Sequence, residues 1–128
     1  IIVAGTCHYT QATDYIHKSS TGDAASVHGF WRNYSGVGTC PSTATVTVYL
    51  QAWWCDDYPY SCYWATLTVG QADVYNGGGG GNRATARWDC ASDNVVGWRA
   101  FVDVDLDNWS DPAGYTYTDP VNLACSPS

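Results

Sequence analysis

Residues that could perform catalysis are few in this 128-residue chain. The three histidines all fall in residues 8–29, which have no clear hydrophobic pattern: His8, His17 and His28. A catalytic triad needs a nucleophile and an acid beside such a histidine, and no Gly-x-Ser-x-Gly motif is present. Asp56 and Asp57 are carboxylates of the kind that a glycosidase uses, but such neighbours more often cap a bend than flank a sugar. We expect surface histidines and no enzymatic activity.

A calcium loop is the second chemical candidate. The segment DVDLDNWSD, residues 103–111, places carboxylates at ligand positions of the EF-hand pattern: Asp103, Asp105, Asp107 and Asp111. The pattern fails at Asn108, where glycine is required, and at Gly114, where glutamate is required. The alternating apolar residues instead indicate a strand, with its outer aspartates balanced by three arginines: Arg83, Arg87 and Arg99. We expect no cofactor; a calcium ion, if one binds, would use Asp107 and Asp111.

The segment QAWWCDDYPYSCYW, residues 51–64, gathers aromatic residues around two cysteines. Neighbouring side chains of a strand point to opposite faces, so Trp53 and Trp54 cannot both be buried. The alternation that begins at Thr43 predicts Trp54 inside with Leu50. It predicts that three aromatic residues face outward: Tyr49, Trp53 and Trp64. Cys55 and Cys62 fall on that same side, and we predict a disulfide between them.

The loop closed by this disulfide would be a rigid, aromatic and acidic tip, carrying Asp56, Asp57, Tyr58 and Tyr60. Two interpretations stay open. Trp53 and Trp64 could simply stack on each other as cross-strand packing. They could instead belong to a binding surface, because Tyr and Trp are enriched at hot spots and a braced loop loses little entropy on binding. Under the second interpretation, the outer aromatic residues and the four loop residues are candidate binding residues.

The composition predicts an all-β protein. All twelve acidic residues are Asp, Lys occurs once and Met is absent, so strong helix formers are scarce, whereas Val, Thr, Tyr and Trp are abundant. Alternating runs predict strands from residue 43 to 54 and over 62–69, and a last strand near residues 115–125. Residues 76–82, NGGGGGN, are expected to form a loop. We predict a single domain over residues 1–128, an antiparallel β-sandwich of about seven strands.

One hairpin of this sandwich is predicted from RATARWDC and VVGWRAFVDVDLD, with its turn at residues 91–94. Small and apolar side chains alternate along both segments, and these would face inward: Ala84, Ala86, Trp88, Trp98, Ala100, Val102, Val104 and Leu106.

Charge and cysteines limit the class of protein. The net charge of −7 argues against nucleic-acid binding. Six cysteines without a C-x-x-C pair favour three disulfides in an oxidising compartment over a zinc site. Beyond Cys55–Cys62 the pairing stays open, and we favour Cys7–Cys40 and Cys90–Cys125. No run approaches the ~20 apolar residues of a membrane helix. Because the chain begins at Ile1, we interpret it as a processed, secreted protein.

The first seven residues, IIVAGTC, form an apolar segment that favours a strand. Ile1, Ile2 and Val3 could leave the domain and add a strand to a partner's sheet. They could pair with a second copy and build a filament. They could equally form an ordinary edge strand of this domain.

A resemblance supports the protein-binding interpretation. The segments RATARWDCASDNVVGWRAFVDVDL and YTYTDPVNLACSPS, with GTCPSTATVTVYLQ upstream, resemble small secreted, cysteine-containing proteins of Streptomyces and related actinobacteria. Some of these look like the adaptor subunit of umbrella toxin particles, which bridges a ring-forming polypeptide and lectin subunits. The resemblance implies a non-catalytic, β-rich module that works through protein–protein contacts.

Our leading hypothesis is therefore a secreted, non-enzymatic adaptor with protein partners, within an antibacterial toxin assembly. The first alternative is a carbohydrate-binding module with Tyr49, Trp53 and Trp64 as a stacking platform for a polysaccharide. Further alternatives are a protease inhibitor that presents residues 56–61, a filament subunit, and a small hydrolase that uses the histidines.

Overall fold

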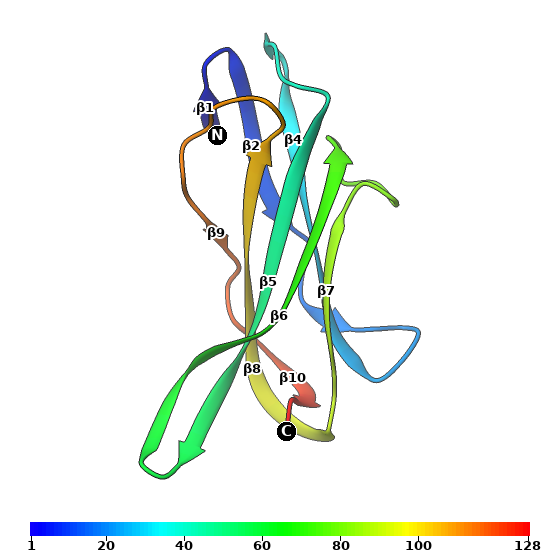
Figure 1. The fold of residues 1–128 in the computed structure, drawn as a ribbon. Helices are drawn as coiled ribbons and strands as arrows, with labels where there is room; N and C mark the ends of the chain where they lie inside the picture. The colour runs from blue at the N-terminus through cyan, green and yellow to red at the C-terminus, as the bar shows by residue number, and fades with distance from the viewer.

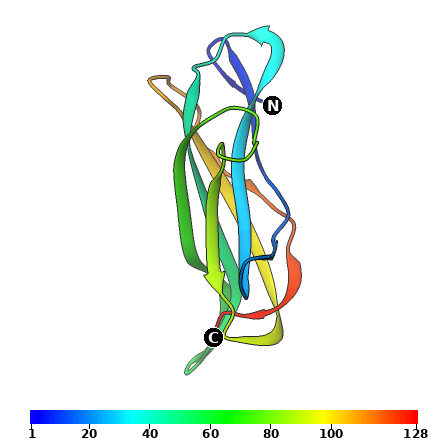
Figure 2. The ribbon, with the colours of Figure 1, turned by 90° about the vertical axis from the view of Figure 1, so that its right-hand side faces the viewer.

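The alternating segments form two antiparallel sheets that pack face to face in this computed structural model (Figures 1 and 2). The structure describes residues 1–34 and 38–128 in full, and residues 35–37 only as part of a strand. Sheet A contains β1 (Ile2–Ala4), β2 (Cys7–Thr13), β3 (His17–Lys18), β4 (Ala24–Gly38) and β7 (Ala84–Asp89). Sheet B contains β5 (Thr43–Asp57), β6 (Tyr60–Tyr75), β8 (Ser92–Leu106), β9 (Thr116–Tyr117) and β10 (Val121–Ser126).

The all-β prediction is confirmed, since the described residues include strands and no helix. Sheet A has the order β1-β2-β4-β3 with β7 also paired to β4, and sheet B has the order β10-β8-β5-β6 with β9 also paired to β8. The strands of six or more residues are β2, β4, β5, β6, β7, β8 and β10, which agree with the expected sandwich. The described residues also include no helix long and apolar enough to cross a bilayer.

The core is the space between the two sheets, and the predicted alternation fills it. The inward side chains of β5 and β8 are fully or almost fully buried: Ala44, Val46, Val48, Leu50, Trp98, Ala100, Val102, Val104 and Leu106. The two buried indole N–H groups donate hydrogen bonds to backbone carbonyl oxygens. Trp31 donates to Val74 at 3.0 Å, and Trp98 donates to Cys125 at 2.9 Å. Burial of these rings therefore leaves no indole N–H without an acceptor.

All three predicted disulfides are present, and no described cysteine is free. Cys7–Cys40 joins the start of β2 to the segment before β5. Cys90–Cys125 joins the connection between β7 and β8 to β10 of sheet B. Three disulfides in a small domain are typical of an oxidising compartment.

The predicted hairpin of residues 83–107 is wrong. β7 pairs with β4 in sheet A, whereas β8 pairs with β5 in sheet B, so the short connection between them crosses from one layer to the other. Ala84 and Ala86 are buried as expected, but Trp88 is 37% exposed. Its indole lies near the end of β7 and donates a hydrogen bond to the Pro127 carbonyl oxygen at 3.3 Å, so it is held by the C-terminal segment instead of the core.

The N-terminal segment is an edge strand of the chain's own sheet. β1 pairs with β2 through Ile2↔Tyr9 and Val3↔His8, Ala4 is buried, and the Trp109 indole N–H donates to the Ala4 carbonyl oxygen at 2.8 Å. Donation of this strand to a partner stays a prediction, and it would require β1 to leave these contacts.

β6 and β7 lie beside each other where the two sheets meet, and Gly70 permits this approach. A Cβ atom at residue 70 would collide with the carbonyl oxygen of Thr85 on β7. Because the obstacle is backbone, it cannot be relieved by a rotamer change, and any larger side chain would force the sheets apart.

We therefore expect Gly70→Ala to lower the free energy of unfolding by about 1–3 kcal/mol, the range for overpacking in a tight site. Urea unfolding followed by tryptophan fluorescence measures this change. Gly79→Ala is the matched control, because a Cβ atom there has no neighbour within 4 Å. Equal stability of the two variants would show that β6 and β7 do not approach so closely.

Candidate binding surface

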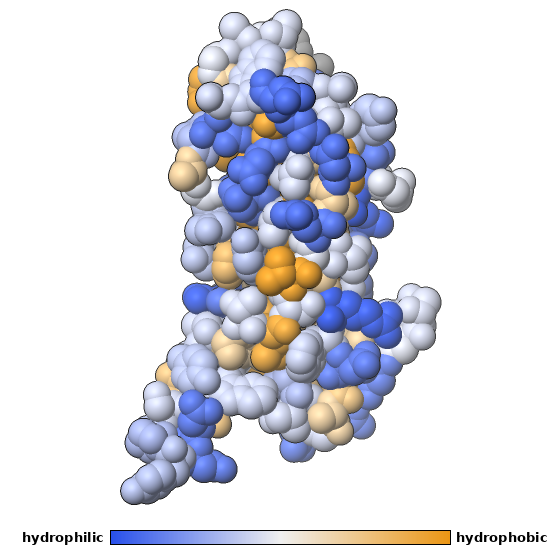
Figure 3. Space-filling model, in the orientation of Figure 1, coloured by the Kyte–Doolittle hydropathy of each residue, from blue (hydrophilic) through white to orange (hydrophobic). Residues whose placement is uncertain are grey.

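The most prominent surface feature is the end of the β5–β6 hairpin, residues 53–64, which we call the arm. β5 pairs with β8 only from Ala44 to Ala52, but it continues to pair with β6 as far as Asp57. Beyond Ala52 the hairpin therefore has no neighbouring strand in the sheet. In Figures 1 and 3 it projects from the lower end of the body.

Two cross-strand contacts hold the arm together. Trp53 lies opposite Trp64, with ring centroids 5.4 Å apart and planes at 70°, and the disulfide joins Cys55 to Cys62 two pairs further out. The stacking of Trp53 on Trp64 is thus real cross-strand packing, yet Trp53 remains 45% exposed. The two interpretations of these tryptophans do not exclude each other.

Trp54 departs from its expected place in the core. It is only partly buried, because β5 has already left the sandwich at this position, and it lies opposite Tyr63 on the second face of the arm. Its indole N–H donates to the Asp56 carboxylate at 3.2 Å. Both faces of the arm therefore carry aromatic rings.

The tip of the arm is exposed on all sides. Tyr58 is 96% exposed and Tyr60 is 77% exposed, and Asp56 and Asp57 are exposed beside them. Among the described residues, neither carboxylate forms an ion pair within the chain. The predicted tip residues thus lie together, and they present phenol rings and uncompensated negative charge.

Tyr49 belongs to a different group, on the outer face of sheet B. Its ring stacks on Phe101 with centroids 4.4 Å apart and planes at 11°, and Tyr115 and Tyr117 pack against the same Phe101 at 5.1 and 5.0 Å. Phe101 was not among the residues predicted for this surface, although the alternation of β8 that buries Ala100 and Val102 also turns Phe101 outward. One face of the Tyr49 ring is therefore covered by Phe101 and is not available to a ligand.

Arg99 connects this aromatic group to the base of the arm. Its guanidinium carbon lies 4.7 Å from the Trp64 ring centroid and 5.3 Å from that of Tyr117. Its Nε donates to the Gln51 side-chain oxygen at 2.6 Å. These cation–π contacts fix Trp64 against the sheet.

A groove lies at the base of the arm, beside the C-terminal residues. It has a volume of about 340 Å³ and is lined by Trp53, Trp54, Cys55, Val95, Val96, Gly97 and Ser126–Ser128. Two tryptophans and two valines make this lining partly apolar, and such a groove can receive a side chain of a bound partner.

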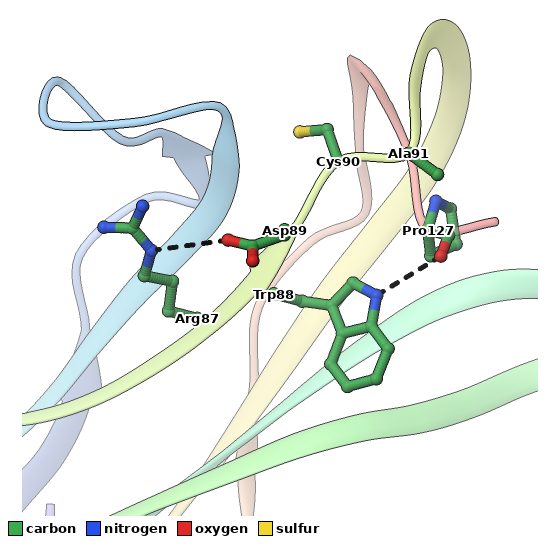
Figure 4. Close-up of a pocket in the computed structure, with 6 residues that line it drawn as sticks. All are labelled: Arg87, Trp88, Asp89, Cys90, Ala91 and Pro127. Atoms are coloured by element: carbon green, nitrogen blue, oxygen red, sulfur yellow. Dashed lines mark hydrogen bonds and ion pairs between the residues drawn. The ribbon is translucent and has the colours of Figure 1, made fainter.

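A second hollow, at the end of β7, has a volume of about 450 Å³ (Figure 4). Arg87 and Asp89 form an ion pair at 4.0 Å, Trp88 bonds to Pro127, and Cys90 is bound in its disulfide. These lining residues include no base placed beside a nucleophile, so the hollow provides no argument for catalysis.

The aspartates of β8 face outward as expected, but the arginines do not balance them. Arg83 and Arg87 belong to the sheet A side of the molecule, where they lie near Asp14 at 3.9 Å and Asp89 at 4.0 Å, and Arg99 bonds to Gln51. The expected balance is wrong because it assumed that β7 and β8 share a sheet.

Asp107 and Asp111, the residues expected to bind calcium, accept hydrogen bonds from different partners. Asp107 accepts hydrogen bonds from the hydroxyl groups of Thr43 at 2.5 Å and Thr45 at 3.3 Å. Asp111 accepts a hydrogen bond from the backbone N–H of Leu106 at 2.7 Å. A hydrogen bond from Asp73 lowers the pKa of Asp107, and the same bond raises the pKa of Asp73. The expectation of no cofactor stays a prediction, as does the choice of Asp107 and Asp111 for any calcium ion that binds.

Asp103, Asp105 and Asp111 instead meet at a hollow of about 270 Å³. Partial burial, followed by the charges of neighbouring aspartates, raises the pKa of Asp103 and of Asp105. Burial, and then the negative charges of the same three aspartates, raise the pKa of Tyr9 to about 12. Burial, and then the repulsion among these groups, make their protonation more favourable in the folded state than in the unfolded state.

The folded state therefore binds protons at Asp103 and Asp105 more tightly than the unfolded state. The resulting stabilisation is fully present below the ordinary pKa of about 3.9 and is lost as the pH rises through the raised values. We expect the Asp103→Asn/Asp105→Asn variant to have a higher urea midpoint than the natural chain at about pH 7, and a smaller fall in stability between about pH 4 and 7. Asp57→Asn, at the arm tip, is the control. A lower midpoint at neutral pH for the double variant would contradict the repulsion.

Comparison with known proteins assigns no family. No family model matches the chain, and no curated protein matches it. Among solved structures, the chain is similar to DesR, a β-glucosidase from Streptomyces venezuelae in complex with D-glucose, with 20% identity and a TM-score of 0.41. The match covers 91% of this chain but only 15% of that enzyme, and at this level it carries no argument for fold or function.

Proposed function

We propose that the chain is a non-enzymatic extracellular adaptor that binds other proteins through the arm. The observation that carries this proposal is the projection of residues 53–64 beyond the sandwich, with exposed aromatic rings on a hairpin closed by a disulfide. Function as a subunit of a secreted antibacterial toxin assembly is the more specific form of the proposal, and it rests on the sequence resemblance.

The arm has the energetic properties of a docking element. Tyr and Trp bury large areas with few rotatable bonds, and they dominate binding hot spots. The cross-strand contact of Trp53 with Trp64 and the Cys55–Cys62 disulfide restrict the arm before any partner binds. Less conformational entropy is then lost on association, which favours tight binding.

The charge of the tip indicates the chemistry of the partner. Asp56 and Asp57 have no basic neighbour among the described ion pairs, and the whole chain carries a net charge of −7. A partner with a cleft for the arm and Lys or Arg at its rim would complement both the rings and the carboxylates.

A second contact is available at the opposite end of the molecule. β1 and the N-terminus lie at the upper end in Figure 1, whereas the arm and the C-terminus lie at the lower end. β1 is the terminal strand of sheet A, and Ile1 and Val3 are exposed. Partners bound at β1 and at the arm would be held apart by the length of the sandwich, as bridging requires.

Polysaccharide binding is the second candidate, favoured by the exposed ring of Trp53 and by exposed Tyr115 and Tyr117 on sheet B. Against it, Trp53 and Trp64 meet at 70°, and Tyr49 is stacked on Phe101. The three residues of the expected platform thus do not present parallel free faces to a sugar.

We expect Tyr58→Ala/Tyr60→Ala to weaken binding of the partner by roughly 30-fold or more, which corresponds to the loss of one hot spot. The partner is first recovered from the culture fluid of the producing organism with the immobilised chain, and its affinity is then measured in purified form. Tyr75→Ala is the matched control, because Tyr75 is also exposed but lies at the other end of β6.

Equal affinity of the tip variant and the control would exclude the arm as the docking element. Retention of the natural chain on a polysaccharide column, lost in Trp53→Ala, would favour the second candidate instead.

The disulfide should contribute to binding more than to folding. We expect Cys55→Ser/Cys62→Ser to unfold cooperatively, because Cys55 lies outside the core, but to bind the partner more weakly as the arm becomes more mobile. Circular dichroism during heating and the same affinity measurement test the two halves of this expectation. Loss of folding without the bond would show that the arm is part of the folding unit.

A further inference from the structure

The outer face of sheet A brings together two histidines that are far apart in sequence. His17 on β3 lies opposite Ser26 on β4. His28, two residues further along β4, is therefore the diagonal neighbour of His17 on the same face. The centroids of the two imidazole rings are 5.7 Å apart and their planes meet at 22°. Asp14 lies beside them, and one ligand atom from each of the three residues is within 4.8 Å of the others.

Hydrogen bonds fix the ring of His28. Its Nδ1 lies 2.6 Å from one carboxylate oxygen of Asp14, and its backbone N–H donates to the other oxygen at 2.7 Å. An ionised carboxylate only accepts hydrogen bonds, so Nδ1 must carry the proton. In the neutral ring, the lone pair is then on Nε2.

His17 is held in the same tautomer by a different acceptor. Its Nδ1 lies 2.9 Å from the backbone carbonyl oxygen of Tyr15, which also can only accept. The neutral His17 ring therefore carries its lone pair on Nε2 as well. A hydrogen bond from the far nitrogen of each ring to an oxygen acceptor is the arrangement that orients histidines toward metals in proteins.

We propose that His17 and His28 form a binding site for a divalent transition metal such as Zn²⁺, with Nε2 of each ring as the ligand atom. Asp14 acts as a positioning residue that orients His28. Its Oδ2 also lies 3.9 Å from the Arg83 guanidinium, so its charge is already shared and is less available to the metal. Imidazole pairs suit zinc, copper and nickel, whereas calcium and magnesium prefer oxygen ligands.

The site is accessible and its position gives the metal a structural effect. The side chains of His28 and Asp14 are each 22% exposed, so an ion can reach them from solvent. Two protein ligands leave coordination positions for water or for a side chain of a partner. Because β3 has only two residues, a metal shared by His17 and His28 would tie this short strand to β4.

The test is a Zn²⁺ titration of the full chain in competition with a coloured chelator. We expect one equivalent to bind, and we expect His17→Gln and His28→Gln each to lower the affinity at least tenfold. Asp14→Asn should lower it about 10–100-fold, as for other residues that orient a metal ligand. His8→Gln is the matched control, because His8 lies on β2 opposite Val3 and outside this group.

A second readout does not depend on affinity. ¹⁵N spectra of the imidazole rings in the metal-free chain should show protonated Nδ1 in His17 and His28, and Zn²⁺ should shift their Nε2 signals. No stoichiometric binding, an equal loss in His8→Gln, or protonated Nε2 in both rings would overturn the proposal. These results are independent of the arm, so they leave the proposed adaptor function untouched.

Discussion

The pairing of β5 with β6 is the interaction on which both the sandwich and its candidate binding surface depend. The same ladder begins at Thr43↔Tyr75 inside the sandwich and ends at Asp57↔Tyr60 in solvent. Over its first part, β8 and the core stabilise it; beyond Ala52 they are absent. A two-stranded hairpin alone in water is marginally stable. The disulfide and the contact between Trp53 and Trp64 therefore stabilise the hairpin in the arm, whereas burial stabilises it in the sandwich.

The base of the arm is held by residues of β8. Gly97 on β8 lies beneath the indole of Trp64, at a position where a Cβ atom would already be 3.5 Å from that ring. Arg99, two residues further along the same strand, forms cation–π contacts with the rings of both Trp64 and Tyr117. The direction of the arm is thus set by side chains of the neighbouring strand, and it can present Tyr58 and Tyr60 at a defined place.

The sequence predicted what depends on alternation and failed where distant strands decide. Leu50, Ala100 and Val102 were predicted to be buried because apolar residues alternate there, and the Cys55–Cys62 bond follows from the alternation along β5. The β7–β8 hairpin failed because a short connection, here Cys90 and Ala91, can turn within one sheet or cross to another, and local composition does not distinguish these. Trp54 and Trp88 failed for a related reason: each continues a correct alternation past the point where an opposing sheet is present.

His17 and His28 show the same limit at a candidate site. They stand eleven positions apart in a weakly patterned segment, and only the pairing of β3 with β4 makes them neighbours. This pair lies on the outer face of sheet A, whereas the arm continues sheet B, and the packed layer containing Trp31 and Trp98 separates the two sheets. A close-packed layer transmits a rearrangement only if it has a second packing arrangement, and Trp31 and Trp98 in this layer are fully buried. Metal binding at one face and partner binding at the arm should therefore be energetically independent, which suits an adaptor that must hold one partner whether or not the other face is occupied.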